Sequence, residues 1–345
     1  MRAARLHEYT DDVGSAFTIE EVDRPTVEAP DDVVIEVEAA GWCHTDNHIV
    51  EGSMREIAGA TLPYTPGHEN AGVVSDVGEG VTRFSPGDSV VVHPAASCGL
   101  CRACRRGEDM YCPDHTFVGI DADGGFAEYL KTKERSLIAL DGLDPVQAAP
   151  HADAGVTAYR AVKKAAADLV AGDYAVLVGM GGLGHIGLQA LHAISPAETV
   201  AVDVKPAALE MADDLGATAT VDSTEEDVAA VVDDLTDGEG AAKIVDFVGS
   251  DETLRYALSA LRPGGDHHVV GYEGQLDVPA QAVIGGEIDY QGTLVGTYPE
   301  LQELIALAEA GDVVARTATY DLDEINEIAH RLEVGDIEGR AVFTP

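Results

Sequence analysis

Positive charge is scarce in this sequence. Among 345 residues there are 21 Lys plus Arg, only six of them Lys, against 62 Asp plus Glu, so the formal net charge is −41. Nucleic-acid binding requires a cationic surface, and anionic membranes attract basic rather than acidic segments. We therefore expect neither a nucleic acid nor a membrane surface among the partners of this protein.

The acidic residues are spread along the whole chain instead of forming a tail. Two unit charges about 10 Å apart in water repel each other by about 0.4 kcal/mol, and this repulsion largely disappears near 1 M salt, where the Debye length is about 3 Å. The composition therefore predicts a halophilic protein of a cytoplasm with molar salt. An ordinary acidic protein is the alternative.

Long uncharged segments are also scarce. Residues 174–197 contain no Asp, Glu, Lys or Arg and are numerous enough to span a bilayer. However, the many glycines, together with His185, Gln189 and His192, favour a buried strand, a glycine turn and a helix. The first residues lack the apolar segment of a signal peptide, and we expect a cytoplasmic location.

Cysteine is limited to five residues, and four of them form the pattern C-x2-C-x2-C-x7-C. In a cytosolic protein this spacing indicates a tetrahedral structural zinc site rather than disulfides. Nearby arginines offset the negative charge of four thiolates around one Zn²⁺. The four cysteines are Cys98, Cys101, Cys104 and Cys112, and the arginines are Arg102, Arg105 and Arg106.

The fifth cysteine, Cys43, is followed 25 residues later by His68. A lone cysteine is usually a small buried apolar residue, but a cysteine and a histidine together suggest an open catalytic zinc site. Such a site needs a third protein ligand, which the spacing alone does not supply.

The distribution of strand signals predicts two domains. Short apolar segments separated by turn residues dominate the first 150 residues, as at 33–37, 71–74 and 89–92, and are typical of a β-barrel. From about residue 155, strands alternate with helices, which indicates βαβ units and a parallel sheet. These later strands are predicted at 174–178, 199–202, 218–221, 244–248 and 268–271.

A glycine-rich turn follows the first of these later strands. Gly179, Gly181 and Gly184 match G-x-G-x-x-G between an apolar strand and an apolar helix, the context in which this motif binds a dinucleotide pyrophosphate. Asp203 follows Gly184 by 19 residues, where an acid accepts hydrogen bonds from the adenosine ribose and repels a 2′-phosphate. NAD is therefore favoured over NADP, although the positive charge of the nearby Lys205 leaves NADP as an alternative.

A series of short motifs runs in order along the whole chain. They are GWCHTDNH (41–48), PGHE (66–69), the four cysteines, DGGFAEY (123–129), AGVTAY (154–159), GMGGLG (179–184) and GRAV (339–342). Together these motifs resemble the zinc-dependent medium-chain alcohol dehydrogenases, and the acidic composition suggests a haloarchaeal member. The resemblance implies an α/β fold: a GroES-like β-barrel catalytic domain (1–152 and 289–345, with a structural zinc lobe at 93–115) and a Rossmann domain with a doubly wound parallel sheet (153–288).

The resemblance also implies individual roles. Asp153 is expected to be the third catalytic zinc ligand, at a position where many members have Cys, and His151 is the alternative. Glu69 is expected to be a carboxylate near the zinc or an alternating fourth ligand. Thr45 and His48 correspond to the proton relay, and Asp46 to the acid that orients His68. The cofactor-binding residues implied are His44, Gly179, Gly181, Gly182, Leu183, Gly184, Asp203, Lys205 and Arg340.

The implied activity is interconversion of primary or secondary alcohols with aldehydes or ketones, by hydride transfer to NAD. We expect two zinc ions per chain, a small alcohol or carbonyl substrate, and a homotetramer, with a dimer as the alternative. A sugar or polyol dehydrogenase of the same superfamily is the first alternative. A zinc- and nucleotide-binding redox sensor without turnover is an alternative of another class.

Overall fold

The computed structural model describes residues 1–55 and 59–345, which divide into two compact units. The first unit contains Met1–Ala154, Thr297–Ala310 and Ala315–Pro345, and the second contains Gly155–Gly296 and Gly311–Val314. Both ends of the chain thus belong to one unit, while the other is built mainly from the middle of the sequence. No helix in the described ranges is both long enough and apolar enough to cross a membrane.

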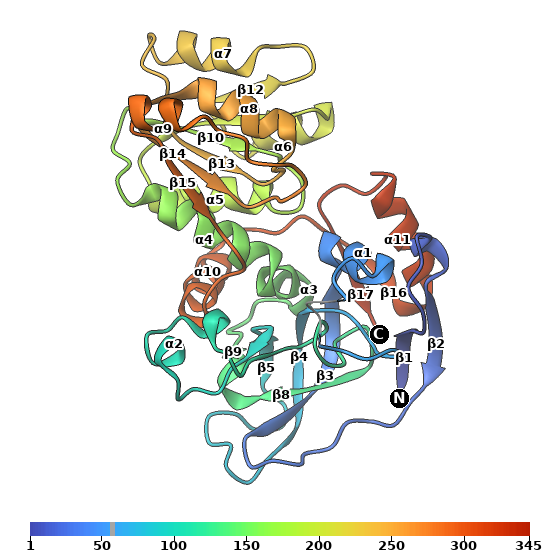
Figure 1. Cartoon of the computed structure of the whole chain (residues 1–345). Helices are drawn as coiled ribbons and strands as arrows, with labels where there is room; N and C mark the ends of the chain where they lie inside the picture. Colours follow the sequence, from blue (N-terminus) through green and yellow to red (C-terminus); the bar gives the residue numbers. More distant parts are fainter. Residues whose placement is uncertain (56–58) are drawn as a thin grey trace. The chain divides into compact units, whose positions relative to one another are not determined.

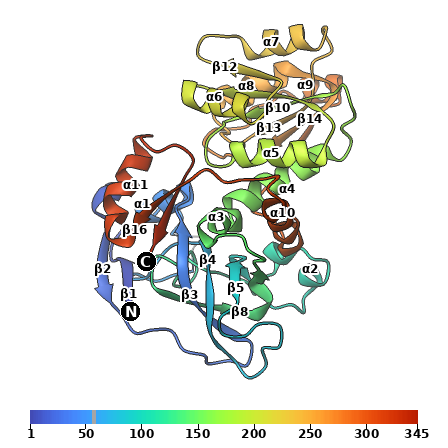
Figure 2. The same cartoon turned by 180° about the vertical axis from the view of Figure 1, so that it is seen from behind.

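The first unit is organised around a seven-stranded sheet, drawn mainly in blue to green in Figures 1 and 2. Its strand order is β16-β17-β3-β4-β5-β9, and β8 also pairs with β3. All of these pairings are antiparallel except that of β16 with β17. The sheet strands are β3 (Asp32–Gly41), β4 (Glu69–Val77), β5 (Ser89–Val92), β8 (Tyr129–Lys133), β9 (Leu137–Ala139), β16 (Thr317–Asp321) and β17 (Arg340–Thr344).

Two small hairpin-like pairs and several helices complete the first unit. Alternating apolar residues of β3 and β4 face a core in which Trp42 stacks on Phe126 with ring centroids 5.5 Å apart. The remaining elements are β1 (Arg2–Leu6), β2 (Phe17–Glu21), β6 (Ala95–Ala96), β7 (Thr116–Phe117), α1 (His44–Glu51), α2 (Arg102–Arg105), α3 (Pro145–Ala148), α10 (Tyr298–Ala310), α11 (Ile325–Glu333) and the 3-10 helices η1 (Val13–Ser15), η2 (Asp109–Tyr111), η3 (Glu134–Ser136), η4 (Ala149–Ala152) and η5 (Leu322–Glu324).

The second unit contains a six-stranded parallel sheet of order β12-β11-β10-β13-β14-β15. From β10, the strands β11 and β12 are added on one side of the sheet, and β13, β14 and β15 are added on the other side. The strand order therefore reverses between β10 and β13, and parallel sheets of this kind bind ligands at that point. Figures 1 and 2 show α5 on one side of this sheet and α7 and α8 on the other. The elements are α4 (Ala154–Ala166), β10 (Tyr174–Val178), α5 (Gly184–Ile194), β11 (Glu198–Asp203), α6 (Pro206–Asp214), β12 (Ala219–Asp222), α7 (Val228–Leu235), β13 (Ala241–Asp246), α8 (Asp251–Ala260), β14 (Leu261–Val269), α9 (Ala280–Gly286) and β15 (Asp289–Gly292).

The predicted combination of a β-rich unit with a parallel α/β unit is confirmed, but several expected limits differ. The strand expected at 244–248 ends at Asp246, and that expected at 268–271 begins at Leu261 and ends at Val269. The return to the first domain was expected at residue 289, yet β15 pairs with β14 in the parallel sheet. These limits depend on strand pairing and on hydrogen bonds in the turns after the strands, and the local apolar pattern reveals neither.

Candidate metal and nucleotide sites

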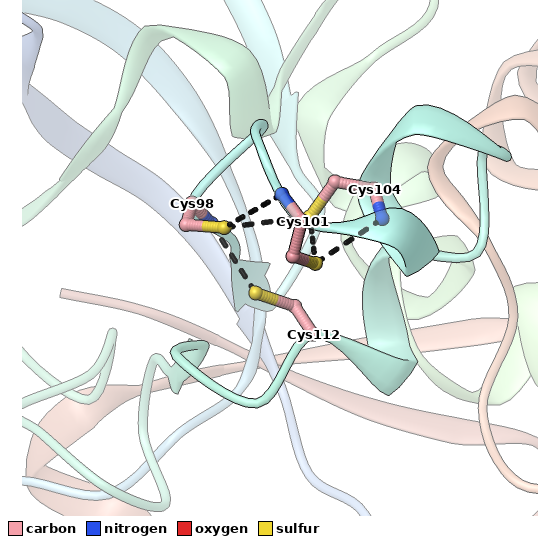
Figure 3. A group of neighbouring side chains, drawn as sticks. All are labelled: Cys98, Cys101, Cys104 and Cys112. Carbon is pink, nitrogen blue, oxygen red and sulfur yellow. Dashed lines mark hydrogen bonds between the residues drawn. The ribbon is translucent and has the colours of Figure 1, made fainter.

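The four spaced cysteines meet at one point of the first unit, and Figure 3 shows their sulfur atoms turned toward one another. The Sγ atom of Cys104 lies 4.0 Å from that of Cys98 and 3.5 Å from that of Cys101. A tetrahedron with zinc–sulfur bonds of about 2.3 Å has edges of about 3.8 Å, so the spacing fits a zinc ion. All five cysteines of the chain are free thiols.

Local backbone geometry prepares this cluster for a cation. Backbone N–H groups point at the sulfurs, as in the hydrogen bonds from Cys101 to Cys98 (3.4 Å) and from Cys104 to Cys101 (3.5 Å). The N–H groups of Leu100 and Cys101 lower the pKa of Cys98 to about 6, whereas burial raises the pKa of Cys112 to about 12. Deprotonation of all four cysteines at one point would require a cation among them.

A second cluster joins Cys43, His68 and Asp153, all buried in the first unit. Cys43 precedes α1, His68 precedes β4, and Asp153 lies between η4 and α4. The Oδ2 atom of Asp153 is 3.6 Å from Cys43 Sγ and 3.4 Å from His68 Nε2. These distances match the edges of about 3.3–3.8 Å expected around a tetrahedral zinc ion with S, N and O ligands.

His151, the alternative third ligand, lies in η4 two residues before Asp153 and is buried. The three ligand atoms that the structure groups together come from Cys43, His68 and Asp153. Their assignment as zinc ligands stays a prediction.

Asp46 holds two members of this cluster in place from the first turn of α1. Its Oδ2 atom accepts a hydrogen bond from the N–H of Cys43 at 2.9 Å, and its Oδ1 atom is 3.4 Å from His68 Nδ1. Burial alone would lower the pKa of His68, but the charge of Asp46 and hydrogen bonding to Asp153 raise that pKa well above its usual range. The link from Asp46 to Cys43 was not predicted, although an acid at the third position of a helix is a known capping signal.

Glu69 and Arg340 form a buried ion pair beside the cluster. Arg340 Nη2 donates to both carboxylate oxygens of Glu69 at 2.6 Å and to the carbonyl of Trp42 at 2.7 Å. Burial raises the pKa of Glu69 even though Arg340 opposes the shift. A Cβ atom at residue 41 would lie 2.1 Å from Glu69 Oε2, so only Gly41 permits this arrangement.

The predicted relay residues lie on α1, directly after Cys43. Thr45 and His48 are partly buried, and His44 is exposed. The rings of His44 and His48 pack edge to face, with centroids 4.8 Å apart, as residues four positions apart on a helix can. The structure thus places these three residues on one short helix that Cys43 directly precedes.

The glycine turn of the second unit connects β10 to α5. A Cβ atom on Gly184 would lie 1.8 Å from the carbonyl oxygen of Gly179, so the tight turn requires glycine there. Gly181, Gly182 and Leu183 form the turn before the first N–H groups of α5. A helix N-terminus of this kind attracts anions such as a pyrophosphate.

Asp203 lies at the end of β11, next to this turn. Its Oδ2 atom accepts a hydrogen bond from Met180 N at 2.6 Å, and its Oδ1 atom accepts bonds from Val204 N (2.8 Å) and Lys205 N (2.9 Å). The carboxylate is therefore held beside the glycine turn, where a ribose would follow a bound pyrophosphate. Arg340 contacts Glu69 and the carbonyl of Trp42 within the first unit, and its predicted role in cofactor binding stays a prediction.

Two family models match this chain. Residues 29–142 match the family model described as the alcohol dehydrogenase GroES-like domain, and residues 182–310 match that of the zinc-binding dehydrogenases. These matches confirm the predicted fold class.

Three similar proteins are described as dehydrogenases, and each matches this chain over nearly its full length. The solved alcohol dehydrogenase of the hyperthermophilic archaeon Aeropyrum pernix shares 46% identity at a TM-score of 0.94, with 100% of each chain covered. An NAD-dependent alcohol dehydrogenase of Saccharolobus solfataricus is 36% identical over 100% of both chains. A D-arabinose 1-dehydrogenase (NADP(+)) of the same organism is 32% identical, covering 100% of this chain and 97% of the relative.

Proposed function

We propose, from the premise that this chain belongs to the zinc-dependent medium-chain alcohol dehydrogenase family, that it interconverts alcohols with aldehydes or ketones using NAD. The observation that carries the proposal is the buried cluster of one thiol, one imidazole and one carboxylate. Three protein ligands leave the fourth position of a zinc ion open, as catalytic zinc sites require.

In this proposal Cys43, His68 and Asp153 hold the catalytic zinc. Bound there, zinc supplies Lewis-acid polarisation of the substrate oxygen, and the nicotinamide of NAD supplies the hydride acceptor. Asp46 orients the His68 ring and the Cys43 backbone. The buried pair of Glu69 and Arg340 supports the cluster next to Asp153, and Glu69 is the candidate for an alternating ligand.

Thr45 and His48 are proposed to carry the proton between the substrate oxygen and solvent. Their family counterparts suggest this role, and their place on α1 immediately after Cys43 supports it. His48 suits the final transfer, because an imidazole exchanges protons near neutral pH.

NAD is the proposed cofactor, bound through the glycine turn and Asp203. Three backbone N–H groups hold the Asp203 carboxylate beside that turn, and a carboxylate there would repel a 2′-phosphate. His44 and Lys205 are proposed as additional cofactor contacts. The assignment of NADP to the D-arabinose relative makes NADP the competing cofactor.

The proposal extends to the assembly and its surroundings. We propose a second, structural zinc at Cys98, Cys101, Cys104 and Cys112, a homotetramer or a dimer, and a cytoplasm with high salt. The zinc is supported by the sulfur spacing and the salt by the charge of −41. Size-exclusion chromatography with light scattering in 2 M KCl tests the oligomer.

A sugar or polyol dehydrogenase remains the second candidate, favoured by the similarity to a D-arabinose 1-dehydrogenase. Initial rates of NADH formation with ethanol, a secondary alcohol, D-arabinose and glucose, in 2 M KCl, separate the two. Turnover of the simple alcohols supports our proposal. Turnover of the sugars alone supports the alternative, and zinc and NADH binding without turnover of any substrate supports a redox sensor.

A further inference from the structure

One carboxylate of the second unit is completely buried at the point where the sheet order reverses. Asp246 is the last residue of β13 and is 0% exposed. In the sheet it lies directly opposite Val178, the last residue of β10, after which the glycine turn begins. An ionised carboxylate is costly to bury unless it is well hydrogen-bonded, so its partners indicate its role.

Asp246 organises the turn between β13 and α8. Its Oδ1 atom accepts hydrogen bonds from Val248 N (2.9 Å) and Gly249 N (2.8 Å), and its Oδ2 atom accepts one from Thr253 Oγ1 (2.7 Å). The imidazole of His267 on β14 lies 3.7 Å from Oδ2. These bonds end the strand at Asp246, although the apolar pattern continues to Val248.

The turn organised by Asp246 packs against the glycine turn. Phe247 N donates to the carbonyl of Val178 at 3.0 Å, and a Cβ atom on Gly179 would lie 2.7 Å from a methyl group of Val248. The two turns therefore touch, and a shift of Val248 would change the space beside Gly179.

The same residue connects a third turn, the one after β14. The Asp246 carbonyl accepts hydrogen bonds from Val270 N (2.9 Å) and Gly271 N (3.1 Å), and Gly249 O accepts one from Gly274 N (2.7 Å). A Cβ atom on Gly249 would lie 2.0 Å from Gly271 O, so the backbones are in direct contact. One residue thus links three turns at the carboxyl ends of β10, β13 and β14.

We propose that Asp246 is a positioning residue for the dinucleotide: it holds the turn 247–250 against the glycine turn and so shapes one wall of the nucleotide site. The inference rests on the proposed binding of NAD. It concerns a residue that need not touch the cofactor and that acts through the backbone of Val248 and Gly249.

The test is a fluorescence titration of the full-length, zinc-loaded protein with NADH in 2 M KCl, together with the KM for NAD and kcat. Asp246→Ala should raise the Kd for NADH at least tenfold and raise KM similarly, with kcat at saturating NAD within about threefold. Asp246→Asn should raise the Kd only about threefold, because its amide oxygen can still accept both backbone N–H bonds while the bond from Thr253 is lost and the Thr253 hydroxyl turns to Ser250 O.

Asp173→Ala is the matched control in the same unit. Asp173 is buried immediately before β10, at the opposite end of the strand, and binds Arg262 (2.6 Å) and Val170 N (3.0 Å). This variant should lower the melting temperature and leave the Kd for NADH unchanged. If both alanine variants weaken NADH binding equally, Asp246 stabilises the unit without positioning the cofactor, and the proposal is wrong.

Two further outcomes separate the possible failures. If Asp246→Ala does not fold, the Thr253→Val variant provides the test, because it removes one hydrogen bond to Asp246 and keeps the shape of the side chain. A rise of threefold or more in the Kd for NADH would support the inference. An unchanged Kd would overturn it. Tight NADH binding by both wild type and Asp246→Ala overturns this inference alone. A wild-type protein that binds neither NADH nor NADPH overturns the proposed function as well.

Discussion

Asp153 determines the net charge of the proposed catalytic zinc site. One thiolate, one carboxylate and a neutral imidazole around Zn²⁺ sum to zero charge, the same total as with two thiolates. Burial acts to raise the pKa of Asp153, but hydrogen bonding to His68 and the charges of His68 and Arg340 lower it overall. The carboxylate is therefore ionised and ready to bind a cation at neutral pH.

Asp153→Asn should lose the catalytic zinc, because an amide is a much weaker zinc ligand than a carboxylate. Zinc content should fall from about two to about one ion per chain, and kcat/KM should drop by at least 100-fold. His151→Gln, the matched control two residues away, should retain both zinc ions and most of the activity. Metal analysis and steady-state kinetics check this, and the reverse pattern would assign the ligand to His151.

Asp203→Gly should shift cofactor preference toward NADP. Removal of the carboxylate removes the ribose acceptor and the repulsion of a 2′-phosphate. We expect the ratio of kcat/KM for NAD to that for NADP to fall at least tenfold, measured with one alcohol at fixed salt. A wild type that already prefers NADP would refute the role given to Asp203.

Zinc binding at Cys43, His68 and Asp153 should depend on pH through His68. In zinc-free protein the pKa of His68 is raised above its unfolded value, so its stabilising contribution is present below about pH 6.5 and is lost as pH rises through the folded pKa. Zinc requires the neutral ring and competes with that proton. The increase in melting temperature on zinc addition should therefore be larger at pH 8.5 than at pH 6.

Asp46→Asn tests the cause of this dependence. Because the charge of Asp46 helps to raise the pKa of His68, the variant should bind zinc with a pH dependence displaced to lower pH. Calorimetric melting of zinc-depleted and zinc-reloaded protein at several pH values measures both effects. A zinc-induced shift that is equal at pH 6 and pH 8.5 would contradict this explanation.

At the scale of elements, the cysteine lobe lacks extended secondary structure. Its only regular pieces in the described chain between Cys98 and Cys112 are the four-residue α2 and the three-residue η2. So little helix cannot hold four thiolates together, and a bound ion would have to supply the folding energy.

Cys101→Ser should therefore act mainly on stability. We expect it to remove the structural zinc and to lower the melting temperature by about 5 °C or more, in line with the loss of a metal site from a two-domain protein. Cys43→Ser should abolish turnover with a much smaller effect on melting. Equal melting temperatures for wild type and Cys101→Ser would show that the lobe does not depend on metal.

The whole molecule carries its excess negative charge over both units. Pairwise repulsions of a few tenths of a kcal/mol act over many pairs, whereas a folded domain is stable by only about 5–15 kcal/mol. Their sum is therefore comparable with the free energy of unfolding, and screening by salt should relieve it.

The melting temperature and the activity should both rise from 0.05 M to 2 M KCl. Most of the electrostatic gain should come within the first few tenths molar, and any further rise would reflect ion binding or stronger apolar burial. Differential scanning calorimetry and NADH-linked assays across the series measure it. A flat or falling melting temperature would refute the halophilic interpretation and leave the proposed enzyme activity untouched.

Features that depend on short spacing could be predicted from the sequence alone. The four cysteines lie within 15 residues, and the glycine turn lies between an apolar strand and an apolar helix, so the local chain already brings these groups together. The β-rich first part and the alternating second part likewise determined the fold class, because periodicity reports which faces are buried.

Tertiary structure decided which distant groups meet. Cys43 and Asp153 are separated by 110 positions, and Glu69 and Arg340 by 271; spacing carries no information about such pairs. The family resemblance predicted that Asp153 joins Cys43, whereas the pairing of Glu69 with Arg340 came from the structure alone. The sequence pattern also did not predict that β13 ends at Asp246. The strand ends there because the Asp246 carboxylate accepts hydrogen bonds from Val248 N and Gly249 N, although the apolar pattern continues. Contacts across sheets and turns, made only when the chain has folded, determine these features.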